Sequence, residues 1–206
     1  MRLYNSATRR KERFQPVGDP VRLYACGPTV YAPAHLGHAK SYVAVDVLRR
    51  WLEYRGHAVR HAQNFTDSGD ETVQMAVRAA VSEAELTARY ESEFLTQMDA
   101  LGNLRPHALP RASEVAEGIG VLAARLLAED RAYESEGGSW LSGDEGEHGA
   151  MRGTEIGAAL CEPASAVDSG PKRGPVDVML WGPQLPGGRS WAPDGVPPGR
   201  QGWHLE

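Results

Sequence analysis

The sequence predicts an α/β fold built on a parallel sheet. Residues 21–26 (VRLYAC) form a short apolar-rich run that ends at Gly27-Pro28, as a buried strand would. Residues 39–56 then carry apolar side chains at helical spacing, and residues 57–67 (HAVRHAQNFTD) have the pattern of a second strand that ends in polar residues. A strand, a helix and a strand in this order are typical of a parallel βαβ unit.

The first predicted helix has one apolar face and a clear end. Gly56 stands where the C-terminal cap of this helix is expected. Further helices are predicted over residues 71–80, 83–101 and 113–128, with Ser113 as the N-cap of the last. The apolar positions of the first helix recur at spacings of three and four: Val43, Val47, Leu48, Trp51 and Leu52.

The pattern changes near residue 131, so three parts are expected. Residues 1–130 hold the βαβ unit and the further helices as the first half of an α/β domain, and residues 131–165 are a short, acidic, Gly-rich and irregular insertion. Residues 166–206 contain 8 Gly and 7 Pro, which argues against regular helices and strands there. Three of the five tryptophans also lie in this segment, which favours an ordered stretch over a flexible linker.

Composition excludes several classes of protein. The 206 residues allow one domain, and a net charge of −5 gives no global footprint for nucleic acid. Cys26 and Cys161 have no paired spacing, so a disulfide framework is not expected. The polar N-terminus lacks the apolar run of a signal peptide, and no stretch approaches the roughly 20 apolar residues that span a bilayer. A cytoplasmic protein without a membrane anchor is the expectation.

The stretch CGPTVYAPAHLGH, residues 26–38, lies where the first strand passes to the first helix. Ligands bind outside the carboxyl ends of parallel strands, and a helix N-terminus attracts anions. His35 and His38 are therefore placed to hydrogen-bond phosphate oxygens, while the small Gly37 lets a nucleotide approach the backbone. The alternative is that His35 only caps the helix and His38 is a satisfied surface residue.

Cys26 has two interpretations as well. A single cysteine on a buried strand is usually a small core residue, and a zinc site needs about four ligands. On chemistry alone, Cys26 is interpreted as part of the core.

Six blocks together resemble a known family: LYACGPTVY, HLGH, VDVLRRWLEYRGH, QNFTD, KRGPVDVMLW and GRQGWHLE. They occur in the order and at the spacings of the N-terminal half of the cysteinyl-tRNA synthetases. HLGH resembles that family's form of the HIGH motif of class I synthetases. The resemblance covers almost the whole chain and is poor only over residues 131–165.

The resemblance implies a Rossmann-type class I catalytic domain with a connective insertion. It implies activation of L-cysteine by ATP to cysteinyl-adenylate and transfer to tRNA(Cys), by a monomer that does not bind membranes. The HLGH residues correspond to the ATP-binding loop, with the two histidines catalytic: His35, Leu36, Gly37 and His38.

The same resemblance assigns a metal and an amino-acid pocket. Cys26 matches the first ligand of a catalytic zinc ion, Zn²⁺, whose open position takes the substrate thiolate. A thiolate binds zinc far better than a neutral hydroxyl does, so the metal would distinguish cysteine from serine. Gly27, Thr66 and Trp203 fall where the family lines its cysteine pocket.

Several features depart from the family pattern. The second zinc-ligand cysteine and the KMSKS loop belong after Glu206, so we expect a fragment that neither binds zinc tightly nor completes aminoacylation. Ala32 stands where the family usually has Asp, and Gly182 stands where a Lys is common. The segment after QNFTD usually carries two adjacent acids and a Lys, but here it reads SGDE, with Gly69 as its second residue. Two alternatives stay open: a cysteine-adenylating ligase of the mycothiol type, and a stand-alone, non-catalytic module that binds a nucleotide or a partner.

Overall fold

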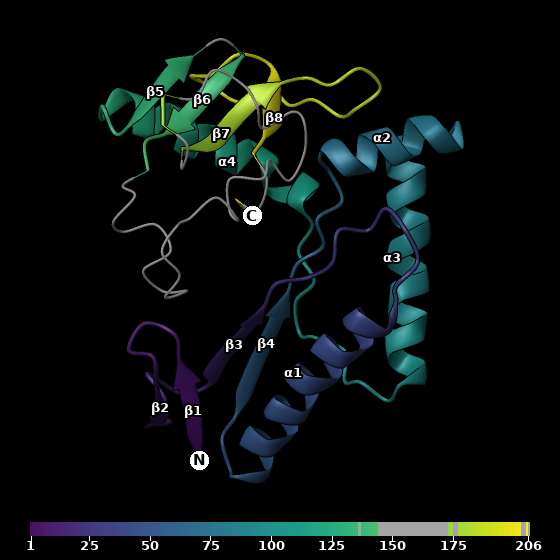
Figure 1. The fold of residues 1–206 in the computed structure, drawn as a ribbon, viewed down its shortest axis with the longest axis vertical. Coiled ribbons are helices and arrows are strands. Elements are labelled where there is room, and N and C mark those ends of the chain that lie inside the picture. The colour runs from purple at the N-terminus through teal and green to yellow at the C-terminus, as the bar shows by residue number, and fades with distance from the viewer. Residues whose placement is uncertain (136, 144–172, 175–176, 203–204, 206) are drawn as a thin grey trace.

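The computed structural model describes residues 1–135, 137–143, 173–174, 177–202 and 205. In the described residues the strands form a two-stranded hairpin, a two-stranded parallel sheet and a four-stranded antiparallel sheet. The parallel sheet lies in the lower half of Figure 1, and the antiparallel sheet lies in the upper half.

The parallel βαβ unit is present as predicted. Strand β3 (Val21–Ala25) pairs in parallel with β4 (Val59–Gln63), and α1 (Leu36–Tyr54) connects them. In β3 and β4 the side chains alternate, and Val21 and Val59 pack with Leu52 of α1. The helix therefore covers one face of the two strands (Figure 1). The C-cap of α1 is Arg55, and Gly56, predicted at the cap, follows it with a φ of +85°, the left-handed conformation in which glycine commonly ends a helix.

The apolar face predicted for α1 is wrong in part. The side chains of Val47 and Trp51 are 59% and 44% exposed, whereas Asp46 and Arg49 are buried. The cause is hydrogen bonding to the segment that follows α3. Asp46 Oδ1 accepts from the backbone N–H of residue 104 at 2.9 Å, and Arg49 Nη1 donates to the carbonyl of residue 105 at 2.8 Å. Satisfied polar groups therefore occupy positions where periodicity alone places apolar ones.

The other three predicted helices are present, with one cap assigned wrongly. The N-cap of α4 is Arg111, and Ser113 lies one residue inside the helix. Ser113 has a tertiary partner: its N–H and Oγ donate to the two oxygens of Asp67 at 2.9 and 2.6 Å. This bond ties the start of α4 to the loop after β4. The helices are α2 (Asp70–Ala79), α3 (Glu83–Ala100) and α4 (Ala112–Ala128).

Phe65 lies at the centre of the largest apolar cluster. It is fully buried between the parallel strands and α3, edge-to-face with Phe94 at a centroid distance of 5.6 Å. Tyr42 of α1 meets Phe94 in the same geometry at 5.1 Å. The cluster holds α1 and α3 against the loop that leaves β4.

The prediction of irregular structure beyond residue 131 is wrong for much of the described chain. Strands form there despite the local Gly and Pro content, because large side chains pair across neighbouring strands. Tyr133 lies opposite Trp140, which is only 2% exposed. Leu180 and Trp181 pack with Ala123 of α4. Figure 1 shows α4 lying against this sheet. The strands pair antiparallel in chain order: β5 (Ala132–Ser135), β6 (Gly138–Leu141), β7 (Val178–Pro183) and β8 (Gly199–Gln201).

One carboxylate joins two distant parts of the chain at the end of this sheet. Asp177 Oδ1 accepts from the N–H of Gly143 at 3.0 Å, and its Oδ2 accepts from the N–H of Gly174 at 2.7 Å. Tyr133 also donates its hydroxyl to Asp177. These hydrogen bonds lower the pKa of Asp177 although burial acts to raise it, so the group is ionised at neutral pH.

The N-terminal hairpin consists of β1 (Arg2–Asn5) and β2 (Arg10–Arg13), which pair antiparallel. Met1 and Phe14 at its ends pack against the cluster of Val21, Leu52 and Val59. The hairpin is therefore anchored to the parallel sheet by its open end.

Candidate functional site

The candidate site lies where the carboxyl ends of β3 and β4 meet the N-terminus of α1. Cys26 is the first residue after β3, and in the structure it is exposed. Its interpretation as a core residue is therefore wrong. The carbonyl of Cys26 accepts a hydrogen bond from the hydroxyl of Tyr42 at 3.2 Å, which fixes the strand end against the second turn of α1.

Gly27 allows the two strand ends to approach closely. Its N–H donates to Asn64 Oδ1 at 2.7 Å, and a Cβ on Gly27 would lie 1.5 Å from the carbonyl oxygen of Asn64. Tyr24 donates to the same Asn64 oxygen at 2.9 Å. Asn64 is thus a positioning residue that the sequence analysis missed, although an Asn in the polar end of the second predicted strand was a usable signal.

Thr66 joins the two loops beyond the strands. Its side chain is 2% exposed, its N–H donates to the carbonyl of Pro28 at 3.1 Å, and its carbonyl accepts from Val30 at 3.2 Å. Asn64 Nδ2 donates to Thr66 Oγ1 at 3.3 Å. The backbone around Gly27 and Thr66, two residues predicted to line the amino-acid pocket, is therefore held rigidly on both sides.

His35 and His38 cap the first helix reciprocally. The N–H of Gly37 donates to His35 Nδ1 at 3.1 Å, and the N–H of His35 donates to His38 Nδ1 at 3.1 Å. The two rings lie 4.1 Å apart between centroids. A Cβ on Gly37 would lie 2.8 Å from His35 Cε1, so glycine is required for this ring position.

The caps determine where each imidazole carries its proton. Because Nδ1 of both rings accepts, each neutral ring bears its hydrogen on Nε2. Burial, and then the neighbouring charge of His35, lower the pKa of His38, which favours that neutral form. The capping alternative for His35 and the phosphate role are thus compatible, since each residue uses one nitrogen for the helix and keeps an N–H donor on the other.

Leu36, between the two, is 84% exposed at the first position of α1. The start of α1 thus presents the Nε2–H donors of the two histidines together with the positive end of the helix, and groups of this kind bind anions.

A buried polar network supports the loop that carries Thr66. Arg189 donates Nη1 to Asp67 Oδ2 at 3.1 Å and Nε to Glu83 Oε2 at 3.2 Å. The other Glu83 oxygen accepts from Thr72 Oγ1 at 2.6 Å and from the N–H of Gly69 at 3.2 Å. Residues far apart in the sequence thereby fix the turn between β4 and α2.

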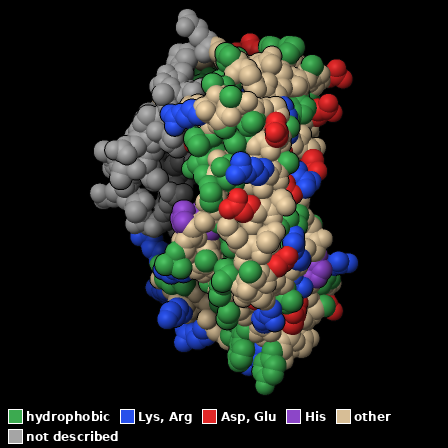
Figure 2. Space-filling view, turned by 90° about the vertical axis from the view of Figure 1, so that its right-hand side faces the viewer, with side chains coloured by type: hydrophobic (Ala, Val, Ile, Leu, Met, Phe, Trp, Pro, Cys, Tyr) green, Lys and Arg blue, Asp and Glu red, His purple; other side chains and the backbone are tan. Residues whose placement is uncertain are grey.

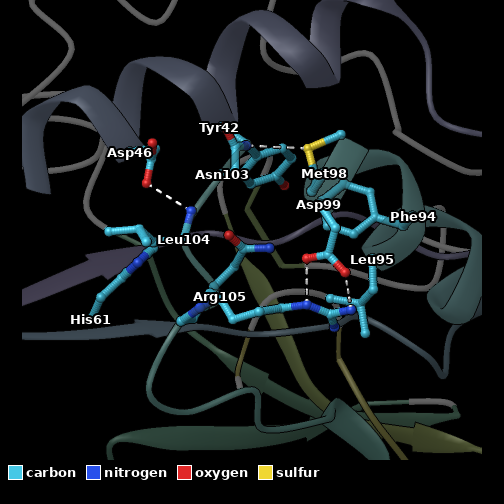
Figure 3. A pocket seen from close by; sticks show the side chains of 12 residues that line it. Tyr42, Asp46, His61, Phe94, Leu95, Met98, Asp99, Asn103, Leu104 and Arg105 are labelled. Carbon is cyan, nitrogen blue, oxygen red and sulfur yellow. Dashed lines mark hydrogen bonds and ion pairs between the residues drawn. The ribbon is translucent and has the colours of Figure 1, made fainter. Parts of the chain in front are cut away.

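A small cavity of about 20 Å³ lies beside the site, between α1, β4 and α3 (Figure 3). Asp46 and Arg105 lie on its wall, with Arg105 paired to Asp99. His61 also lines it, 4% exposed, and neither ring nitrogen of His61 has a hydrogen-bond partner among the described residues. A cavity of this size accommodates a water molecule.

Comparison with known proteins decides the family. The family described as "tRNA synthetases class I (C) catalytic domain" matches residues 13–206. The chain belongs to this family. It is 37% identical over 209 residues to a cysteine–tRNA ligase of Pyrococcus horikoshii and 36% identical over 212 residues to one of Gloeobacter violaceus. These alignments cover 100% of this chain, but 43% and 44% of the relatives. The chain therefore spans less than half the length of these curated relatives.

Solved structures agree on the fold. The crystal structure of a ternary complex of LeuRS from Agrobacterium radiobacter with tRNA and LeuAMS matches with a TM-score of 0.50 at 20% identity. The match covers 58% of this chain and 16% of that chain. The expected class I synthetase fold is thus confirmed.

The described residues do not by themselves fit the zinc ion that the family resemblance implies. Among them, no three His, Cys, Asp or Glu side chains gather as a metal site would require. Cys26 supplies one exposed thiol, and Trp203 of the predicted cysteine pocket lies outside the described residues. No described helix is long and apolar enough to cross a membrane.

Proposed function

We propose that the protein containing this chain activates cysteine with ATP and transfers it to tRNA(Cys). The observation that carries the proposal is the alignment of the whole chain with cysteine–tRNA ligases, together with a reciprocal histidine cap at the strand end. In this proposal the protein is a cytoplasmic monomer. Residues 1–130 are its nucleotide-binding half, residues 131–165 an insertion, and residues 166–206 the segment that returns toward the active site.

The histidine pair acts on the phosphates of ATP. The carboxylate of cysteine attacks the α-phosphorus, a bond from carboxylate oxygen to phosphorus forms, and pyrophosphate leaves. Negative charge grows on the phosphate oxygens during this step. The Nε2–H groups of His35 and His38 donate hydrogen bonds to that charge, and the positive N-terminal end of α1 stabilises it, while the N–H of Gly37 serves the cap. Their positions are fixed before the reaction by the cap bonds, so little reorganisation is needed.

The substrate cysteine lies, in this proposal, over Gly27 and Thr66, with Trp203 as a further wall. Cys26 is one zinc ligand, and the remaining ligands come from outside the described residues. The zinc would bind the substrate thiolate. No step of the adenylation above depends on it.

Two assays test the function. The protein that contains this chain should catalyse cysteine-dependent exchange of pyrophosphate into ATP and should charge tRNA(Cys). Exchange without charging would favour the mycothiol-type ligase, and the absence of both would favour the stand-alone module.

A further inference from the structure

The N-terminal hairpin carries a charge opposite to that of the rest of the chain. Residues 1–14 contain five Lys or Arg and one Glu, and all five cations are exposed. The net charge of residues 1–14 is therefore +4. Because the whole chain has a net charge of −5, residues 15–206 have a net charge of −9. Such asymmetry favours binding of a polyanion by the basic segment.

Strand register places three cations and an aromatic ring on one face of the hairpin. Arg2 lies directly opposite Arg13, and Tyr4 directly opposite Lys11. Residues two apart on a strand share a face, so these four side chains share one, while Leu3 and its neighbours lie on the other. Tyr4 is 61% exposed. We call the four residues the basic face.

The basic face has no counter-charge within the described chain. None of the ion pairs among the described residues includes Arg2, Lys11 or Arg13. The one acid of the hairpin, Glu12, lies opposite Leu3 on the other face, and its carboxylate accepts from Thr8 and Asn5. Like charges directly opposite each other destabilise a hairpin, so the arrangement gains stability from an external anion.

A helical surface elsewhere on the molecule provides a contrast. On the side of the molecule where α3 lies, acidic and basic side chains are interspersed (Figure 2). Near the two ends of α3 and the start of α4, Arg105 pairs with Asp99 and Arg111 pairs with Glu91. The hairpin is arranged differently, because its cations surround an exposed ring and make no ion pair with the residues that the structure describes, although Arg2 Nη2 donates to the carbonyl of Lys11 at 2.6 Å. That combination suits a nucleic-acid strand, whose phosphates meet the cations while a base stacks on the aromatic ring.

We propose that the basic face of the N-terminal hairpin binds the phosphate backbone of RNA and stacks one base on Tyr4. This goes beyond the proposed function, because the hairpin is apart from the strand ends where adenylation is placed. The binding requires neither ATP nor cysteine, so it can hold even if the proposed reaction fails.

The test is a fluorescence-anisotropy titration of the 206-residue chain against a labelled 12-nucleotide single-stranded RNA at several salt concentrations. Each lost phosphate contact lowers the slope of log K against log salt by about 0.7 for a single strand. The variant Arg2→Ala/Lys11→Ala/Arg13→Ala should therefore reduce the slope by about 2 and weaken binding at least about tenfold. Tyr4→Ala should weaken binding about tenfold with an unchanged slope, and Tyr4→Phe should bind like the parent chain.

The matched control is Arg78→Ala/Arg89→Ala/Arg125→Ala, which removes the same charge from exposed positions on α2, α3 and α4. An equal loss of slope in this control and in the hairpin variant would overturn the proposal, because the attraction would then be non-specific. Binding of vesicles that contain phosphatidylserine, with no binding of RNA, would overturn it in favour of a membrane surface. The circular dichroism of each variant should match that of the parent, since the substituted side chains lie outside the apolar clusters.

Discussion

Arg189→Ala should destabilise the chain far more than removal of an ordinary surface arginine. The guanidinium is the partner of two nearly buried carboxylates, since the side chains of Asp67 and Glu83 are 5% and 2% exposed. Removal of one partner from a buried ion pair costs about 3–5 kcal/mol, because an uncompensated charge remains.

The structure reduces that figure in two ways. Arg189 itself is 28% exposed, so water reaches the site when the side chain is lost. Glu83 also keeps its bonds from Thr72 Oγ1, from the N–H of Gly69 and from the N–H of residue 189, which alanine retains. We therefore expect a loss of about 2–3 kcal/mol in the free energy of unfolding, or a fall in Tm of about 4–12 °C for a chain of this size.

Urea unfolding of the 206-residue chain, followed by circular dichroism, measures this loss. Arg125→Ala is the matched control, because Arg125 is 73% exposed and pairs with Glu129 within one helix, where such pairs contribute about 0.5 kcal/mol or less. If the two variants unfold within about 0.5 kcal/mol of each other, the network does not stabilise the loop as argued. A double-mutant cycle with Glu83→Gln should give a coupling of at least about 1 kcal/mol.

Three further outcomes are expected. In the protein that contains this chain, His38→Ala should lower cysteine-dependent pyrophosphate exchange by about two orders of magnitude, because a donor to the growing phosphate charge is lost. The fold should survive, and unchanged exchange would refute the phosphate role. Cys26→Ser in that protein should lower the zinc content and the affinity for cysteine, and full zinc occupancy would exclude Cys26 as a ligand. Burial first, and then the charges of Arg49 and His107, lower the pKa of His61 in the folded chain. The unfolded chain therefore binds the extra proton more readily than the folded chain does. The free energy of unfolding should fall as the pH drops below about 6.5. His61→Phe should flatten this decline between pH 7.5 and 5.5, and an unchanged profile in urea unfolding would show that His61 does not cause it.

Local sequence signals predicted the parallel unit well. Between residues 21 and 63, a short apolar run predicts a strand, apolar residues at helical spacing predict a helix, and a glycine predicts where that helix ends. These signals agree with one another and with the structure, in which Gly56 has a φ of +85°. The unit could therefore be predicted from neighbouring residues alone. The antiparallel sheet could not, because β6 and β7 are separated by more than thirty residues and pair through side chains such as Trp140 and Met179. Gly and Pro describe local breaks in the chain and carry no information on such long-range pairs.

The candidate site shows the same division. The histidines stand out in the sequence because both lie within one turn of a helix start. The role of Asn64 depends on Gly27, which is 37 residues away in the chain and only 2.7 Å away in space. The buried positions of Asp46 and Arg49 likewise depend on backbone groups that follow α3. Partners of this kind become visible only when the chain is folded.

Asp177 has a consequence for how this end of the antiparallel sheet can come apart. Its carboxylate joins Gly143, which follows β6, to Gly174, which precedes β7, and it also accepts from the Tyr133 hydroxyl of β5. One side chain therefore holds three separate segments at the same point. Loss of this carboxylate would release all three segments together and not one by one.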